Sequence, residues 1–147
     1  IEGFKKVIEK LLRETKMTFL LAGAEREKNF LEPLAALNPL RVHNLAGETG
    51  LKHLAALIDH SEFVLANYSS VMHLALEQKF RVAAVFGPTD PEKSGQKSEK
   101  FHAVLENISC SPCERSTCRF SRQACFEDLS PEKVFDACRE LIHAEVH

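Results

Sequence analysis

Phe63-Val-Leu-Ala-Asn67-Tyr-Ser-Ser-Val-Met-His73 decides the fold, together with Val82-Ala-Ala-Val-Phe86-Gly-Pro-Thr-Asp90 further along the chain. Each segment opens with a short apolar run typical of a buried parallel strand and then turns polar. A helical pattern separates the two runs, and strand, helix and strand in this order predict a right-handed βαβ unit. Because parallel strands end at the same edge of a sheet, the two polar turns are expected to lie together, where α/β proteins bind their ligands.

The same alternation of helices and short strands extends over the whole chain. Apolar spacing predicts helices over Phe4–Leu12, Glu25–Leu37, Leu51–His60, Val71–Gln78 and Ser130 to about Ala144, and strands over Met17–Ala22, Arg41–Leu45, Phe63–Ala66, Val82–Phe86 and Ala103–Leu105. This pattern predicts an α/β fold with a Rossmann-like parallel sheet and helices on both faces, in one domain over residues 1–147. Since such domains usually open with a strand and this chain opens with a helix, we expect a further strand upstream.

The composition is that of an ordinary globular protein and excludes several classes. The 147 residues are 44% hydrophobic and 27% charged, with a formal net charge of -2, which gives no indication of a nucleic-acid surface. Arginines at 115, 119 and 122 form a small cluster of a kind that is usually solvated. No apolar run approaches the roughly 20 residues that span a bilayer. The first residues lack a signal-peptide pattern, so we expect part of a cytoplasmic protein without a transmembrane segment.

The turns after the two central strands are candidates for binding phosphate groups. Asn67, Tyr68, Ser69 and Ser70 precede a helix whose first N–H groups are free, and such a terminus suits a diphosphate. A helix capped by Ser69 or Ser70 that binds nothing fits the same residues. The second turn is the strand-end loop, defined as Gly87, Pro88, Thr89 and Asp90. Gly87 permits close approach of the backbone and Thr89 can donate to a phosphate or sugar oxygen, although a tight turn without a ligand has the same composition.

Three further side chains have both a functional and a structural interpretation. Glu25 and Glu27 follow the first predicted strand, where an acidic residue can accept hydrogen bonds from ribose hydroxyls. Acidic residues also favour a helix N-terminus without any ligand, and this second interpretation is preferred for the two residues taken alone. His73 lies one turn into the fourth helix. It can face the ligand or occupy the core, and the core position is favoured.

Four cysteines fall within sixteen residues, in the spacing Cys110-x2-Cys113-x4-Cys118-x6-Cys125. We call residues 110–125 the cysteine loop. Four thiolates in one loop can form a tetrahedral zinc site. Disulfides from Cys110 or Cys113 to Cys118 or Cys125 are an alternative, although they are disfavoured in a reducing compartment. Free thiols in a flexible loop are the third possibility, and the sequence leaves all three open.

The order of these motifs resembles the ADP-heptose:lipopolysaccharide heptosyltransferases, glycosyltransferase family 9. The family pattern combines a Gly-x-x-x-Glu/Asp turn, Asn-Leu-Ala-Gly-x-Thr-x-Leu, Asn-Asp-Ser-Gly-x-Met-His-x-Ala and Phe/Tyr-Gly-Pro-Thr-x-Pro. The matching segments here are Gly23–Glu27, Asn44–Leu51, Asn67–Ala75 and Phe86–Pro91. Many members also carry a Cys-Ser-Pro-Cys segment and a helix opened by Ser/Thr-Pro-Glu, and this chain has Cys110-Ser-Pro-Cys113 and Ser130-Pro-Glu132.

The resemblance implies the C-terminal, donor-binding half of a GT-B glycosyltransferase. Such an enzyme transfers heptose or a related sugar, with inversion, from ADP-heptose to a lipid-linked glycan such as the lipopolysaccharide core. No cofactor is expected for catalysis, the base is expected in the absent N-terminal half, and this stretch alone is expected to be inactive. The resemblance implies ribose contact by Glu27, diphosphate and sugar contact by Asn67–His73, and a pocket border at Gly87–Asp90. The parent enzyme is expected in the cytoplasm or peripheral to the inner membrane.

Two residues depart from the family pattern. Its Asp-Ser-Gly is Tyr68-Ser69-Ser70 here, which removes a carboxylate that faces the donor and places a Cβ where the backbone approaches a phosphate. Two alternative functions therefore remain. One is a degenerate, non-catalytic nucleotide-binding module, and the other is an interaction element stabilised by zinc at the cysteine loop.

Overall fold

The computed structural model describes residues 1–94 and 98–143 of the chain. The chain divides into two compact units, Ile1–Leu57 and Ile58–His147, and the described residues of each unit are treated by themselves. Within the described residues, no helix combines the length and the apolar character needed to cross a membrane.

The first unit packs three helical segments and a pair of short parallel strands. Its elements are α1 (Glu2–Glu14), β1 (Phe19–Leu21), the 3-10 helix η1 (Glu25–Glu27), α2 (Lys28–Ala35) and β2 (Val42–Asn44), and α3 (Leu51–Asp59) runs across the boundary to the second unit. β1 and β2 are parallel, with Leu20 opposite His43. The core contains one buried residue from each of α1, α2 and β2, namely Ile8, Leu34 and Val42. The amphipathic spacing of α1 and α2 thus determines which of their apolar residues form the core of this unit.

A single arginine connects the end of α1 to the start of the sheet. The guanidinium of Arg41 donates to the carbonyl oxygens of Leu12 at 2.9 Å, Thr15 at 2.7 Å and Met17 at 2.7 Å. The last carbonyls of a helix have no partner within the helix, and a cation is favourable beside them. Arg41 therefore closes the C-terminal end of α1 and orients the connection into β1.

We expect Arg41→Ala to lower the free energy of unfolding by about 2 kcal/mol, because hydrogen bonds to a charged donor are lost from partly buried carbonyls. Urea denaturation followed by circular dichroism measures the change. Arg26→Ala is the matched control, since Arg26 is exposed on η1. Equal stability of the two variants would contradict the role given to Arg41.

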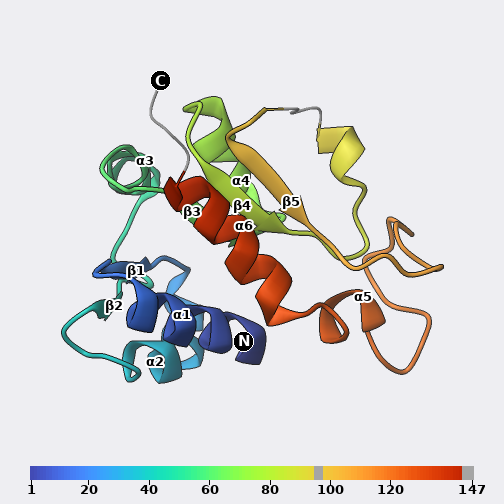
Figure 1. The fold of residues 1–147 in the computed structure, drawn as a ribbon, viewed down its shortest axis with the longest axis horizontal. Helices are drawn as coiled ribbons and strands as arrows, with labels where there is room; N and C mark the ends of the chain where they lie inside the picture. Colours follow the sequence, from blue (N-terminus) through green and yellow to red (C-terminus); the bar gives the residue numbers. More distant parts are fainter. Residues whose placement is uncertain (95–97, 144–147) are drawn as a thin grey trace. The chain divides into compact units, whose positions relative to one another are not determined.

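The second unit is a three-stranded parallel sheet with a helix on each face (Figure 1). Its order is β3–β4–β5, and its elements are β3 (Val64–Asn67), α4 (Ser70–Glu77), β4 (Val82–Val85), the 3-10 helix η2 (Pro91–Ser94), β5 (Phe101–Val104), α5 (Ala124–Glu127) and α6 (Pro131–His143). α4 packs on β3 and β4, and α6 packs on β4 and β5. Every residue of β4 is buried, as a central parallel strand covered on both faces requires.

The expected parallel α/β architecture is confirmed, but the five strands form two sheets rather than one continuous sheet. β1 pairs only with β2, and β3, β4 and β5 pair among themselves, within the described residues. The expected upstream strand and the single domain over 1–147 stay predictions.

Most predicted element boundaries agree with the structure to within a few residues, and the differences are local. Gly50 occupies the position before α3, and its carbonyl accepts from the backbone N–H of Leu54 at 2.9 Å; the sequence had favoured Thr49 as the residue that caps this helix. The helix predicted over Glu25–Leu37 begins as the separate 3-10 turn η1 and continues through Pro33. α5 and η2 were not predicted, because four residues carry too little periodicity. The predicted end of the last helix at Ala144 lies outside the described residues.

Candidate functional site

The turns after β3 and β4 lie side by side at one edge of the sheet. Asn67 pairs with Val85 in the parallel register. The backbone N–H of Tyr68 donates to the carbonyl of Val85 at 3.0 Å, one step beyond the last pair of β3. The expected meeting of the two polar turns is therefore confirmed for the second unit.

The turn after β3 starts α4 with a side-chain cap. The Ser69 hydroxyl accepts from the backbone N–H of Met72 at 3.4 Å, which confirms Ser69 as the N-cap. Ser70 is the first residue of the helix and is exposed. Its backbone N–H is among the donors at a helix N-terminus that have no partner within the helix. At the carboxyl edge of the sheet, the turn therefore exposes backbone N–H groups that have no partner within the helix, together with the partial positive charge of the N-terminus of α4.

The core position favoured for His73 is wrong, because its side chain is exposed. His73 lies on the side of α4 that faces the turn, and its ring is edge-on to Tyr68 with centroids 5.3 Å apart. Tyr68 is 44% exposed and also contacts Phe86 at a centroid distance of 5.5 Å. The partly exposed ring of Tyr68 thus lies in the turn between β3 and α4, in contact with the ring of Phe86 and with the imidazole of His73.

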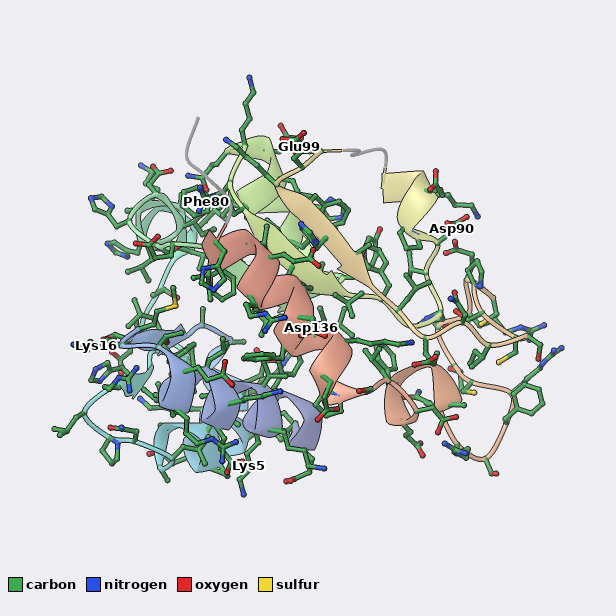
Figure 2. The ribbon with its side chains drawn as sticks, viewed as in Figure 1. Lys5, Lys16, Phe80, Asp90, Glu99 and Asp136 are labelled. Atoms are coloured by element: carbon green, nitrogen blue, oxygen red, sulfur yellow. The ribbon has the colours of Figure 1, made fainter. Side chains whose placement is uncertain are left out.

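The cysteine loop makes hydrogen bonds to the strand-end loop Gly87–Asp90. Asp90 is labelled in Figure 2. The Ser111 hydroxyl donates to the carbonyl of Gly87 at 2.7 Å, and the N–H groups of Cys113 and Glu114 donate to the carbonyl of Pro88 at 3.0 and 2.8 Å. Glu114 in turn accepts from the N–H of Asp90 at 3.0 Å. That hydrogen bond and Lys93 lower the pKa of the Glu114 carboxyl.

Gly87 is needed for packing against Phe126 of α5. A Cβ added at Gly87 would come within 2.3 Å of the Phe126 ring. The close approach that the sequence predicted at Gly87 is therefore present, but the group that approaches is an aromatic side chain of the same chain.

A cavity of about 550 Å³ opens between the cysteine loop and the ends of β3 and β4. Among the predicted donor-binding residues, those that line it are Asn67, Tyr68, Gly87, Pro88 and Thr89. Ser69, Ser70, His73 and Asp90 do not line it. The remaining wall is mostly the cysteine loop and α5, including Arg115, Arg119 and all four clustered cysteines. The cavity thus joins the two features that the sequence identified separately.

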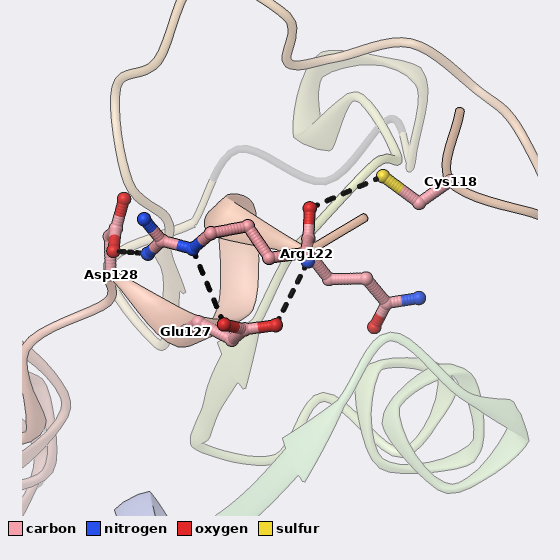
Figure 3. A network of polar contacts seen from close by, with 5 residues as sticks. Cys118, Arg122, Glu127 and Asp128 are labelled. Atoms are coloured by element: carbon pink, nitrogen blue, oxygen red, sulfur yellow. Dashed lines mark hydrogen bonds and ion pairs between the residues drawn. The ribbon is translucent and has the colours of Figure 1, made fainter. Parts of the chain in front are cut away.

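Arg122 holds the end of the cysteine loop to α5 (Figure 3). Its guanidinium pairs with Asp128 and, at 3.3 Å, with Glu127. Glu127 also accepts from the backbone N–H of Gln123 at 2.9 Å. The carboxylates of Asp128 and Glu127 raise the pKa of Arg122. Cys118 is part of the same network, because its thiol donates to the carbonyl of Arg122 at 3.6 Å.

All five cysteines are free thiols in this structure. Burial raises the pKa of Cys125, and the nearby thiols of Cys110, Cys118 and Cys113 raise it further. Within the described residues, no three His, Cys, Asp or Glu side chains lie close enough to hold a metal ion in this arrangement. Cys138 is separate: it is buried in α6, where burial raises its pKa to about 12.

Glu25 and Glu27 belong to the first unit, where both have local contacts. The carboxylate of Glu27 accepts from the backbone N–H of Ala24 at 2.7 Å, as expected for an acid at a helix start. The side chain of Glu25 lies against Gly47, which has a φ of +79° and no room for a Cβ. These contacts agree with the structural interpretation of both acids, and a contact between Glu27 and ribose stays a prediction.

Sequence reasoning missed Ser111, Glu114 and Phe126 as parts of this site. The Cys-Ser-Pro-Cys segment pointed to the thiols alone, and the hydroxyl and backbone N–H groups between them bind the strand-end loop. An exposed apolar residue beside a cysteine, such as Phe126, has no distinguishing pattern in one sequence. Its partner Gly87 was the available signal, since a glycine without a positive φ at a strand end often marks a close contact.

We expect Gly87→Ala to destabilise the protein by about 1–3 kcal/mol, because the new methyl group overlaps the Phe126 ring. Gly87→Ala combined with Phe126→Ala should recover part of the loss, which thermal denaturation of the four proteins in the cycle measures. Gly3→Ala is the control, since a Cβ there meets nothing within 4 Å. Strictly additive losses at 87 and 126 would show that the two positions do not contact each other.

Known proteins give the family of this chain. The family model for glycosyltransferase family 9 (heptosyltransferase) matches residues 1–124. Lipooligosaccharide heptosyltransferase 2 of Campylobacter jejuni is 33% identical over 104 residues, which are 70% of this chain and 33% of that protein. Lipopolysaccharide heptosyltransferase 2 of Salmonella typhimurium is 24% identical over 145 residues, which are 97% of this chain and 42% of that protein. The chain thus spans less than half the length of these relatives.

Solved structures agree with the fold. The structure of E. coli ADP-heptose lps heptosyltransferase II has a TM-score of 0.75 at 22% identity, over 95% of this chain and 40% of that one. A glycosyl transferase family 9 structure from Veillonella parvula has a TM-score of 0.75 at 19% identity, over 96% of this chain and 40% of that one. From the family match and the arrangement of its strands and turns, the chain belongs to glycosyltransferase family 9, the heptosyltransferases.

Proposed function

We propose that this chain is the donor-binding part of a glycosyltransferase that transfers heptose, or a related sugar, from ADP-heptose to a lipid-linked glycan such as the lipopolysaccharide core. The base that activates the acceptor belongs to another part of the enzyme, so this stretch alone is inactive. By the same proposal the enzyme works in the cytoplasm, peripheral to the inner membrane, because its acceptor is anchored in a membrane.

The observation that carries the proposal is the pairing of the two polar turns at the carboxyl edge of β3 and β4. In open α/β sheets ligands bind at this edge. The Tyr68 N–H to Val85 hydrogen bond holds the turn before α4 beside the strand-end loop. One turn supplies a helix N-terminus and the other supplies Thr89 on a cavity wall. A nucleoside diphosphate needs both, since its phosphates are anionic and its sugar carries hydroxyl groups.

The proposed chemistry requires stabilisation of a leaving group. When the glycosidic bond of ADP-heptose breaks, the electron pair stays on the diphosphate, which gains negative charge. Backbone N–H groups at the start of α4 stabilise that charge more strongly in the transition state than in the ground state. This part of the reaction therefore needs no cofactor.

Tyr68 and Ser70 shape the donor preference in this proposal. Tyr68 lines the cavity with an exposed ring, where many family members have an acid. Ser70 adds a hydroxymethyl group beside the donors of α4. A degenerate module that binds nucleotide without catalysis is the competing function, and these two residues favour it over an unrelated role.

Calorimetric titration of the chain with ADP, GDP and UDP tests the proposal. We expect saturable binding that prefers ADP, because the family relatives include a structure described as an ADP-heptose enzyme. Equal affinity for the three nucleotides, or binding unchanged in the Thr89→Val and Tyr68→Ala variants, would contradict a donor site at this edge of the sheet.

Restoring the family turn should strengthen donor binding. We expect Tyr68→Asp with Ser70→Gly to bind ADP-heptose about tenfold more tightly, equivalent to ~1.4 kcal/mol. The added carboxylate can accept from sugar hydroxyls, and the glycine removes the Cβ beside the phosphates. Titration of both proteins with ADP-heptose measures the change. No gain in affinity would indicate that the present turn suits a different ligand.

Glu27→Gln should weaken ADP binding while it keeps the hydrogen bond from the Ala24 N–H, since an amide oxygen can still accept that bond. A neutral acceptor holds a ribose hydroxyl less strongly than a carboxylate does, by about 1 kcal/mol. Glu25→Gln is the comparison. An equal loss in the two variants would assign the effect to local charge and not to a contact made by Glu27.

A further inference from the structure

The cysteine loop has almost no core of its own. All residues from 105 to 133 are described, and none of them is buried. Before α6 begins at Pro131, the four-residue α5 is the only regular element in this stretch. Long loops without secondary structure are uncommon in compact domains, and segments that cannot bury apolar surface need a cross-link to hold one conformation. This loop nonetheless forms most of a cavity wall and donates three hydrogen bonds to the strand-end loop.

The four clustered thiols lie around one space. Cys110, Cys113, Cys118 and Cys125 all line the same 550 Å³ cavity, although they come from positions up to fifteen residues apart in the sequence. All four are free, and three of them are only partly exposed. The four thiols therefore border a common space without forming a covalent cross-link.

We propose that Cys110, Cys113, Cys118 and Cys125 bind one Zn²⁺ ion as four thiolates, and that the ion fixes the cysteine loop against the strand-end loop. Zinc takes four sulfur ligands in a tetrahedron at about 2.3 Å, so the sulfur atoms stand roughly 3.8 Å apart. The thiols do not meet at that spacing in the arrangement described. Binding therefore draws the loop inward, into the cavity that its thiols already line.

The charges on the cavity wall distinguish a metal site from two disulfides. Four thiolates and one Zn²⁺ carry a net charge of -2, whereas two disulfides are neutral. Arg115 and Arg119 line the cavity, and neither takes part in an ion pair among residues 1–94 and 98–143. Arg122, by contrast, is paired with Asp128 and Glu127. Arg119 lies over the Phe120 ring at 5.0 Å and, like Arg115, has no carboxylate partner among these residues. Two cations without a carboxylate partner match the charge of the tetrathiolate site, and two disulfides would supply no charge for them.

The ion is structural in this proposal. Four protein ligands leave no open position for a substrate, as in structural zinc sites. Binding releases the four thiol protons, so affinity rises with pH. Because Ser111 and the N–H of Cys113 hold the carbonyls of Gly87 and Pro88, metal binding also fixes the wall of the cavity next to Thr89.

Metal content and Co²⁺ spectroscopy of the full chain test the site. The chain purified under reducing conditions with zinc in the medium should hold one zinc per chain. Replacement of zinc by Co²⁺ should give the intense visible bands of a tetrahedral site and the near-ultraviolet bands of sulfur-to-cobalt charge transfer, and added Zn²⁺ should remove both. Cys113→Ser and Cys125→Ser should weaken binding by more than roughly 100-fold, since loss of even an outer-shell partner costs up to that much. Cys138→Ala should bind as the wild type does, because Cys138 is buried in α6.

A measurement without substitutions covers the case in which a serine variant fails to fold. Alkylation of the wild-type chain by iodoacetamide, read by mass spectrometry, should spare the four loop cysteines in the presence of Zn²⁺ and modify them after chelation. Absence of zinc with no thiolate bands from Co²⁺ would overturn the proposal. The proposal would equally be overturned if the chain purified under reducing conditions contained disulfides among the four loop cysteines. Alkylation of these cysteines at the same rate with and without Zn²⁺ would also overturn it.

Discussion

Parallel pairing of β4 with β3 on one side and β5 on the other determines where the second unit can bind a ligand. β4 is buried along its whole length, so its register and direction cannot change without exposing the core. That register sets Asn67 opposite Val85 and brings the turn before α4 beside Gly87. A shift of one residue would move every side chain of the strand to the other face. The site therefore depends on apolar packing that contacts no ligand.

The wall of the site comes from a part of the chain with little packing of its own. The cysteine loop reaches the strand-end loop through Ser111 and through the N–H groups of Cys113 and Glu114. Phe126 fills the space that Gly87 leaves open. Since these contacts are few and exposed, the shape of the cavity depends on any further interaction that fixes the conformation of the cysteine loop. A bound metal ion would connect the stability of the loop to the shape of the candidate donor pocket.

Much of this arrangement could be predicted from the sequence, because local signals determine it. Short apolar runs gave the strands, and Ser69 before a helical pattern gave the cap of α4. Side-chain contacts between distant segments could not be predicted. Arg41 binds carbonyls that lie 24 to 29 residues earlier, and nothing around it in the sequence marks those partners. His73 was expected in the core but is exposed, with its ring edge-on to that of Tyr68.

Nuclear magnetic resonance of the amide groups during titration with ADP tests the central claim most directly. If the carboxyl edge of β3 and β4 binds the diphosphate, the largest shift changes should fall on the N–H groups of residues 67–71 and of Gly87 and Thr89. Residues of α6, which packs on β4 and β5, should change little. Changes centred elsewhere, or none at saturating ADP, would contradict a donor site built on these two turns.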